Sequence, residues 1–175
     1  MNDRGLQRRA DFAENPCRRA EIQESDLFHQ DPYRFQQKLS TMNVNGLVSR
    51  YLKAQGIVTK KSDLGLNFTF QGWNFLLWND REDPLLFRLT LPGIFDVTDA
   101  NFARAIMACN NINWNYKVVK AVLYDYEDGK EKGASVWMCY EQQLDTLPDT
   151  EALVNRAIQS LLAACDAFSK EMSDD

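Results

Sequence analysis

Apolar and polar residues alternate over three consecutive stretches of the chain, which is the pattern of half-buried β-strands. The alternation covers residues 66–70, 73–78 and 85–91. Gln71–Gly72 suits a two-residue turn between the first two stretches, and the polar sequence NDREDP separates the second from the third. Pro92–Gly93 is expected to end the third strand. These features predict a three-stranded antiparallel meander.

A period of three to four residues predicts a helix on either side of this meander and another at the end of the chain. The first helix covers NVNGLVSRYLKAQG and is expected to end at Gly56, where a left-handed residue is favourable. The last helix is capped by Asp149 or Thr150 and has apolar residues at helical spacing over 153–168.

The middle helix is expected over DANFARAIMACN, with Thr98 as its cap. Asparagines in NNINWN are expected to end it, because Asn tolerates the left-handed conformation. The buried side of this helix is predicted to carry the large apolar residues and one smaller one: Phe102, Ile106, Met107 and either Cys109 or Asn110.

Two further strands are predicted in YKVVKAVLYDY and ASVWMCYEQ, joined by a loop that contains Asp128–Gly129 and is closed by Gly133. The resulting order is α-βββ-α-ββ-α. Strands grouped in runs, with helices between and after them, are typical of the α+β class. We therefore predict a twisted, antiparallel, five-stranded sheet with helices on one face.

Residues 1–43 differ from the rest of the chain and are predicted to form an N-terminal arm. Up to Met42 the arm has seven basic and seven acidic residues, few large apolar residues and no long periodic segment. A short helix is possible over 32–42, since Asp31 can cap it and Pro32 suits its first position. Residues 44–172 are predicted to form a single α+β domain.

Charge and cysteine usage narrow the functional classes. The formal net charge is −5 and the pI is about 5.0, which argues against a large nucleic-acid surface because such surfaces rely on Lys and Arg. The four cysteines, Cys17, Cys109, Cys139 and Cys165, form no C-x-x-C pair and are expected to be reduced thiols. Neither a secretory signal nor a membrane-spanning stretch is recognised, so the expected location is the cytoplasm.

No pattern of a catalytic, metal or cofactor site emerges from the sequence. The single histidine, His29, lies in the arm, and the scattered cysteines do not have the spacing of zinc ligands. YDYEDG fails as a calcium loop, because tyrosines occupy the positions that need carboxylates. Glu82 and Asp83 are adjacent carboxylates in a turn-rich loop and are expected to be solvated. We therefore expect a protein that is not an enzyme and has no cofactor, although a site formed only in space would escape this reasoning.

Several strands carry apolar residues on both faces, whereas a sheet covered by helices on one face should be polar on the other. If the second face is open, it presents an apolar patch with an arginine, and such patches mark interfaces. The candidate protein-binding residues on this face are Leu76, Trp78, Leu86, Arg88 and Trp137. The alternative is that the N-terminal arm folds back over this face.

The element order resembles that of YbjN-like proteins and type III secretion chaperones, which are bacterial. The resemblance is carried by YLKAQG, by FTFQGWNFLLWNDREDPLLFRLTLP, by Asn110 and Asn113 in CNNINWNYKVVKAVLYD, and by the closing helix. It spans residues 44–172 and leaves the arm unmatched. The resemblance implies a helix-covered sheet, homodimerisation, and a protein-binding or regulatory role without catalysis.

The main hypothesis is a cytoplasmic chaperone, adaptor or regulatory domain that uses the apolar sheet face to bind a protein partner or a second copy of itself. The alternative is a sensory domain that binds a small ligand between sheet and helices, with polar groups from Asn110, Asn113 or Tyr124.

Overall fold

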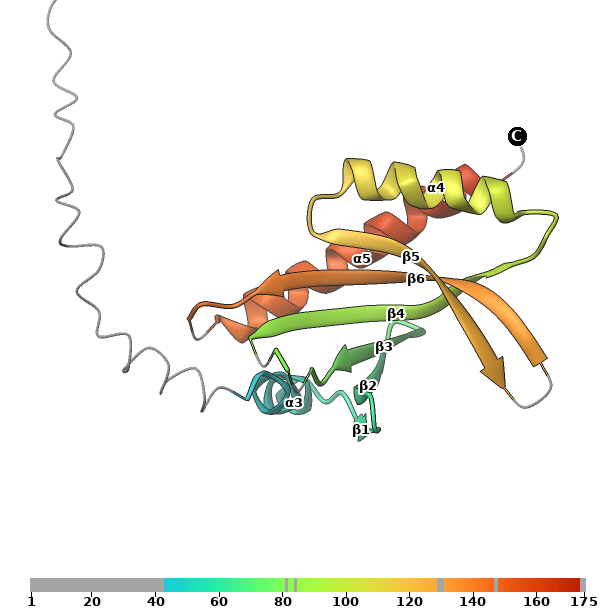
Figure 1. The fold of residues 1–175 in the computed structure, drawn as a ribbon. Coiled ribbons are helices and arrows are strands. Elements are labelled where there is room, and N and C mark those ends of the chain that lie inside the picture. The colour runs from blue at the N-terminus through green and yellow to red at the C-terminus, as the bar shows by residue number, and fades with distance from the viewer. Residues whose placement is uncertain (1–42, 81, 84, 129–130, 147, 174–175) are drawn as a thin grey trace, which may run out of the picture.

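The computed structural model describes residues 43–80, 82–83, 85–128, 131–146 and 148–173, which form three helices and six strands (Figure 1). The predicted helix over 32–42, together with His29 and Cys17, lies outside the described residues. The elements are α3 (Val44–Ala54), β1 (Thr59–Lys61), β2 (Gly65–Phe70), β3 (Trp73–Trp78), β4 (Leu86–Val97), α4 (Phe102–Asn115), β5 (Val119–Asp128), β6 (Glu131–Gln143) and α5 (Thr150–Met172).

All six strands form one antiparallel sheet in the order β1-β2-β3-β4-β6-β5. The α+β class and the antiparallel sheet are confirmed, but the predicted number of five strands is one too few. The missed strand is β1, whose three residues, Thr-Lys-Lys, have no apolar alternation. A strand so short and polar at the edge of a sheet leaves no hydrophobic pattern in the sequence.

The β2–β3 hairpin has the predicted two-residue turn. Gln71 and Gly72 both have positive φ angles, of 50° and 81°, which is the backbone of a type I′ turn. The predicted end of the next strand at Pro92–Gly93 is wrong, because β4 continues to Val97. It does so through an irregularity between Leu91 and Phe95, where its register with β6 shifts. The glycine has a φ of 61° and the proline lies within this shift, so both are accommodated without ending the strand.

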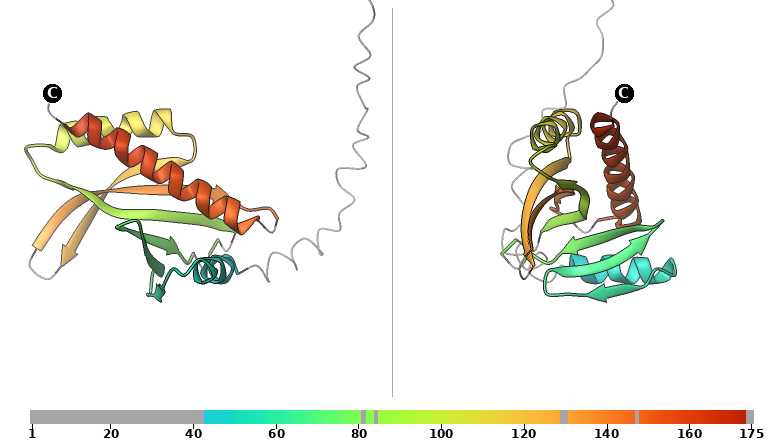
Figure 2. Two further views of the ribbon diagram at one scale, coloured as in Figure 1. Left: turned by 180° about the vertical axis from the view of Figure 1, so that it is seen from behind. Right: turned by 90° about the vertical axis from the view of Figure 1, so that its right-hand side faces the viewer.

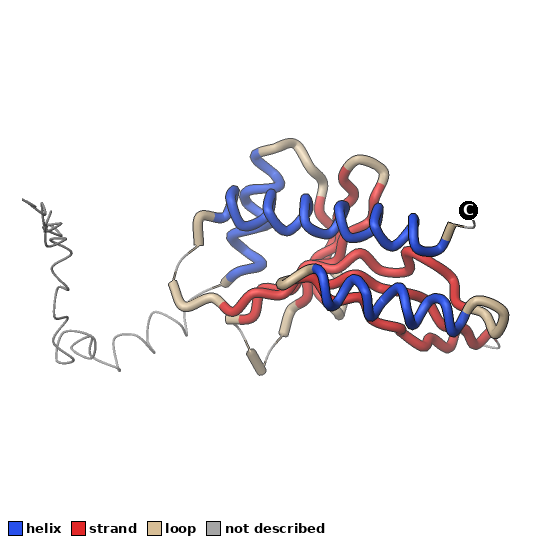
Figure 3. The backbone as a smooth tube through the Cα atoms, turned by 90° about the horizontal axis from the view of Figure 1, so that it is seen from above, coloured by secondary structure: helices blue, strands red, loops and turns tan. Residues whose placement is uncertain are grey.

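Helices α4 and α5 lie side by side over one face of the sheet (Figures 2 and 3). Apolar side chains from this face, from both helices and from α3 form one continuous core. Buried residues of α5 extend along most of the helix and join this core, as predicted. The N-cap of α5 is Asp149, whose side chain accepts a hydrogen bond from Ala152 N at 3.1 Å. Its Phe168 meets Phe95 of β4 edge to face, with ring centroids 5.7 Å apart.

Within the second hairpin, Gly133 does not close the loop as predicted but lies inside β6, opposite Tyr126 of β5. The tyrosine ring occupies the space that a side chain at Gly133 would fill. Glycine therefore serves here as the partner of a large aromatic residue rather than as a turn residue.

The orientation of α4 is the main departure from the sequence prediction. Its buried residues are small or medium in size: Ala105, Ala108, Cys109 and Ile112. The large residues predicted to be buried, Phe102, Ile106 and Met107, are instead exposed. Thr98 does not cap the helix either; its backbone N–H donates to Oδ1 of Asn101, the residue before the helix. Close packing of α4 against α5 favours small residues on its inner side.

Candidate functional site

The sheet face turned away from α4 and α5 is covered by no helix of the described chain. Its residues come from alternate positions of β3, β4, β6 and β5, whose strand register brings them side by side. Leu76 pairs with Thr90, Thr90 with Cys139, and Cys139 with Lys120. This row shows that one face of the sheet combines apolar, polar and charged side chains.

Three aromatic rings from three strands form a row on this open face. Trp137 of β6 stacks on Tyr124 of β5 with ring centroids 4.3 Å apart, and its ring centroid lies 6.5 Å from that of Trp78 of β3. The indole N–H groups donate within the sheet, from Trp78 to Thr90 at 2.9 Å and from Trp137 to Ser135 at 3.0 Å. Because these donors are already paired, the rings offer apolar and π surface to a ligand.

A cross-strand ion network borders the aromatic row. Nε of Arg88 lies 2.7 Å from Oε1 of Glu141, its register partner, while Lys120 pairs with the other carboxylate oxygen. The Arg88 guanidinium also lies 5.9 Å from the ring centroid of Trp78, a cation–π contact. Burial raises the pKa of Glu141, but the hydrogen bond from Lys120 and the charge of Arg88 outweigh it, so that the pKa is lowered overall.

These groups enclose a shallow depression of about 370 Å³, which we call the aromatic hollow. The side chains of Trp78 and Trp137 are half-buried, whereas Tyr124 is 43% exposed. The residues that line it are Trp78, Arg88, Lys120, Val122, Tyr124, Trp137, Cys139 and Glu141.

The structure places three of the five residues proposed from sequence in the lining of the aromatic hollow and the other two outside it. Trp78, Arg88 and Trp137 all line the aromatic hollow. Leu76 lies on the same face but is only 4% exposed, so it cannot offer contact surface as it stands. Leu86 is half-buried near the end of β4, opposite Gln143, and does not line the hollow.

Five of the eight lining residues are absent from the set proposed from sequence, and three of these, Lys120, Val122 and Tyr124, lie on β5. Val122 and Tyr124 alternate with buried Val119, Ala121 and half-buried Leu123. The stretch is apolar on both faces, so alternation alone does not tell which face is covered. The register of β5 against β6, which places Val122 opposite Trp137, is the information that the sequence does not display.

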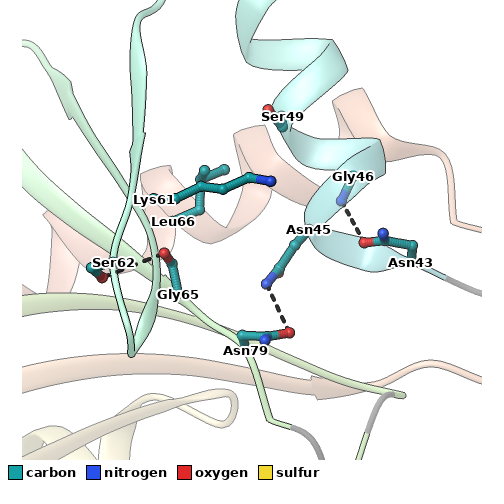
Figure 4. Close-up of a pocket in the computed structure, with 9 residues that line it drawn as sticks. All are labelled: Asn43, Asn45, Gly46, Ser49, Lys61, Ser62, Gly65, Leu66 and Asn79. Carbon is teal, nitrogen blue, oxygen red and sulfur yellow. Dashed lines mark hydrogen bonds between the residues drawn. The ribbon is translucent and has the colours of Figure 1, made fainter.

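A second depression, of about 330 Å³, lies where the start of α3 approaches the end of β3 (Figure 4). Asn45 donates to Asn79 across it at 3.3 Å, and its cationic group is Lys61, which is exposed. Asn43 already accepts the hydrogen bond of Gly46 N, at 2.7 Å, so one helix-terminal donor is used by the cap. This depression is polar and lacks the aromatic wall of the first.

The polar groups considered for a small-ligand pocket do not converge. Asn113 forms two hydrogen bonds with the backbone of Ala121, accepting from its N–H at 2.7 Å and donating to its carbonyl at 3.1 Å. Asn110 is exposed on α4, and Tyr124 lies on the other face of the sheet. The space between the sheet and the helices is filled by the core.

The described cysteines are buried thiols, and the loop carboxylate Asp83 is held by hydrogen bonds within the fold. Burial raises the pKa of Cys109 to about 11 and that of Cys165 to about 12, and burial also raises that of Cys139, so each thiol is held in its neutral form. Asp83 accepts hydrogen bonds from Leu85 N and Gln143, within the loop predicted to be solvated.

The described residues contain neither a metal-binding cluster nor a membrane-spanning helix. No group of three or more His, Cys, Asp or Glu side chains is placed to hold a metal ion. No helix in the described ranges has the length and apolar character needed to cross a membrane.

Comparison with known proteins supports the fold alone. No family model matches the sequence, and no curated protein matches it significantly. Among solved structures, the chain is similar to YbjN from E. coli, a protein suggested to be a transcription regulator. The similarity covers 70% of this chain and 87% of YbjN, with a TM-score of 0.50 and 12% sequence identity. The chain therefore has a YbjN-like fold, and the match does not extend specifically to type III secretion chaperones.

Proposed function

We propose that this chain, with its YbjN-like fold, is a non-enzymatic cytoplasmic domain that binds another protein in a chaperone, adaptor or regulatory role. The observation that carries the proposal is the row of aromatic rings, Trp78, Trp137 and Tyr124, on a sheet face that no described helix covers. Aromatic residues and arginine are the common anchors of protein interfaces, and here the two types adjoin.

The chemistry of the aromatic hollow defines the segment that would fit. Its rings would receive an aromatic or branched aliphatic side chain from the partner. Arg88 and Lys120 together outnumber Glu141 by one positive charge, and the Lys120 side chain is 62% exposed. A carboxylate next to the apolar anchor would therefore be favoured. We propose an extended segment with this pair of groups as the ligand.

A second copy of this chain is a poorer occupant of the same face. Two concave surfaces placed face to face leave both depressions unfilled, whereas an interface core packs as densely as a protein interior. The proposed partner is therefore a different protein.

A photo-crosslinking amino acid in place of Tyr124 tests the proposal in cells that normally make the protein. We expect a discrete adduct with another polypeptide, to be identified by mass spectrometry. The matched control carries the same group in place of Val58, an apolar residue that is 85% exposed outside the hollow. Equal adducts at both positions, or an adduct with a second copy of this chain, would contradict the proposal.

Truncation of the central ring then tests whether the hollow supplies the affinity. Trp137→Ala removes the ring that contacts both other aromatic residues. We expect at least about a thirtyfold rise in the Kd for the crosslinked partner, the effect of an interface hot spot of about 2 kcal/mol. Val58→Ala should leave the Kd unchanged, and titration calorimetry measures both.

A further inference from the structure

The N-terminal arm contains the pair of groups that fits the aromatic hollow. In the sequence EIQESDLFHQD, residues 21–31, Asp26 precedes Leu27 and Phe28, so a carboxylate lies close to a branched aliphatic and an aromatic side chain. These residues precede the part of the chain that the structure describes. Their sequence matches the chemistry of the hollow, which combines aromatic rings with two cationic side chains.

Charge distinguishes this segment from the rest of the arm. Residues 21–31 contain four acidic residues and no lysine or arginine, whereas residues 1–20 and 32–42 each have two more basic than acidic residues. The hollow has one more positive than negative charge, in a chain whose formal net charge is −5. An acidic segment is therefore repelled by the molecule as a whole and attracted at the hollow.

The described chain begins close to the hollow. Asn45, at the start of α3, donates to the side chain of Asn79 at 3.3 Å, and Asn79 directly follows Trp78 of the hollow (Figure 4). The chain from Phe28 to Asn43 spans about 50 Å when extended. If residues 32–42 form the predicted helix, the same chain still spans about 30 Å. Phe28 can therefore reach the hollow in either case.

We propose that residues 24–28 occupy the aromatic hollow of their own chain and compete there with the partner protein. This inference rests on the proposed function, because it assigns an internal competitor to the same site. The spacing of the groups supports it. In an extended segment, Asp26 and Phe28 point to the same side, about 7 Å apart. Lys120 and Val122 have the same spacing along β5, and Val122 lies opposite Trp137. The carboxylate thus meets Lys120 while the ring of Phe28 meets the indole of Trp137.

The exposed basic residues of α3 and β1 are the competing destination for an acidic segment. They are Arg50, Lys53, Lys60 and Lys61. The depression beside them is polar and has no aromatic wall, so it offers charge without a place for Phe28. The hollow offers both, which makes it the better site for residues 24–28.

A tethered segment needs little affinity to close the hollow. A site joined through a short linker has an effective local concentration of about 1 mM, so a segment with a Kd of about 0.1 mM in free solution would occupy the hollow in about nine molecules of ten. The partner must displace it, which raises the apparent Kd of the partner about tenfold. The arm would then act as a built-in regulator of the sheet face.

A photo-crosslinking amino acid in place of Phe28 in the full chain tests the contact. We expect an adduct within one chain, with the mass of a single copy, 20.2 kDa, that peptide mapping assigns to Val122, Tyr124 or Trp137. The matched control has the same group in place of Phe12. This residue is an aromatic residue of the same arm with acidic neighbours, but it lies between two pairs of arginines. The control should give no adduct with the hollow.

Phe28→Ser in the full chain tests whether the segment closes the hollow. The probe is a synthetic peptide of residues 21–31, and titration calorimetry measures its binding. We expect the variant to bind the peptide at least about tenfold more tightly than the native chain does, because the native hollow is already occupied. Phe12→Ser should bind it as the native chain does. Adding Lys120→Glu or Trp137→Ala to Phe28→Ser should abolish binding, and circular dichroism confirms that each variant is folded.

Three outcomes would overturn the inference. Adducts from position 28 to α3 or β1 would place the segment on the basic residues there. Adducts between two copies would replace docking within one chain by exchange between chains. Equal affinity of the native chain and Phe28→Ser for the peptide would show that the native hollow is open.

These failures are distinct from a failure of the proposed function, which depends on an adduct between position 124 and another polypeptide. That adduct without an internal one would overturn the arm contact and leave the proposed function standing. An internal adduct without a foreign one would support the arm contact and overturn the proposed function.

Discussion

Gly65 is a residue at which the backbone leaves no room for a side chain. It begins β2 opposite Trp78, has a φ of 152°, and a Cβ atom there would lie 2.0 Å from the carbonyl oxygen of Leu77. Real Cβ atoms do not approach a backbone atom so closely, so any other residue must displace β3. The strand that would move is the one that carries Trp78 to the aromatic hollow.

We predict that Gly65→Ala lowers the free energy of unfolding by about 3 kcal/mol or more, because it adds backbone displacement to the strain of a positive φ. Gly56→Ala is the matched control. Gly56 has a φ of 75° but open space around it, so only the conformational cost of about 1–2 kcal/mol applies. Urea unfolding followed by circular dichroism compares the two. Equal losses would show that the contact with Leu77 is relieved without cost.

Individual residues were predictable where a local rule determines them and not where strand register does. Gln71–Gly72 follows the turn chemistry of a two-residue hairpin, and Asp149 follows the capping preference of a helix start. Tyr124 belongs to the aromatic hollow only because β5 pairs with β6 in one particular register. That pairing depends on contacts between distant parts of the chain, which a single sequence does not show.

At the scale of elements, a side chain joins α4 to the free edge of the sheet. β5 is an edge strand, and Asn113 of α4 pairs with both backbone groups of Ala121 as a neighbouring strand would. The amide covers part of an edge that would otherwise present unpaired donors and acceptors. The element order in the sequence does not reveal this contact, because the sequence predicts Asn113 only as a helix-ending residue or a ligand group.

We predict that Asn113→Ala lowers the free energy of unfolding by about 1–3 kcal/mol, since two partly buried backbone groups lose their partner. Asn113→Asp keeps the acceptor for the N–H of Ala121 and removes the donor to its carbonyl. It should therefore lower the free energy of unfolding by less than Asn113→Ala does. Amide hydrogen exchange at Ala121 should accelerate in Asn113→Ala. An unchanged exchange rate would mean that water or a shifted side chain replaces the amide.

The side of α4 that faces the core was predicted wrongly for a reason that applies to the whole element. The sequence prediction assumes that the largest apolar residues of a helix face the core. This assumption holds where a helix packs on a sheet without a second helix close beside it. Here α5 lies beside α4, and the inner side of α4 holds Ala105 and Ala108 in close contact. The inward pattern of α5 was predictable because its apolar residues form one broad and continuous stripe.

For the molecule as a whole, two buried thiols link its stability to alkaline pH. Cys109 of α4 and Cys165 of α5 both belong to the core beneath the two helices. Burial raises their pKa values from an ordinary 9.0 to about 11 and about 12. Above pH 9 the unfolded chain loses these protons while the folded chain keeps them. The folded state then binds more protons than the unfolded state, so stability falls as pH rises.

We predict that the free energy of unfolding, after allowance for other groups, is independent of these thiols below pH 9 and falls from pH 9 to about pH 11 or 12. Each thiol adds a slope of up to about 1.4 kcal/mol per pH unit while only its unfolded form is ionised. Tyr and Lys also titrate at high pH, so the comparison is with a Cys109→Ala, Cys165→Ala double variant. Its urea-unfolding energy should start lower, because two side chains are truncated, and should decline less steeply above pH 9. Parallel declines in the two proteins would show that the core admits water to these thiols and that their ionisation does not require unfolding.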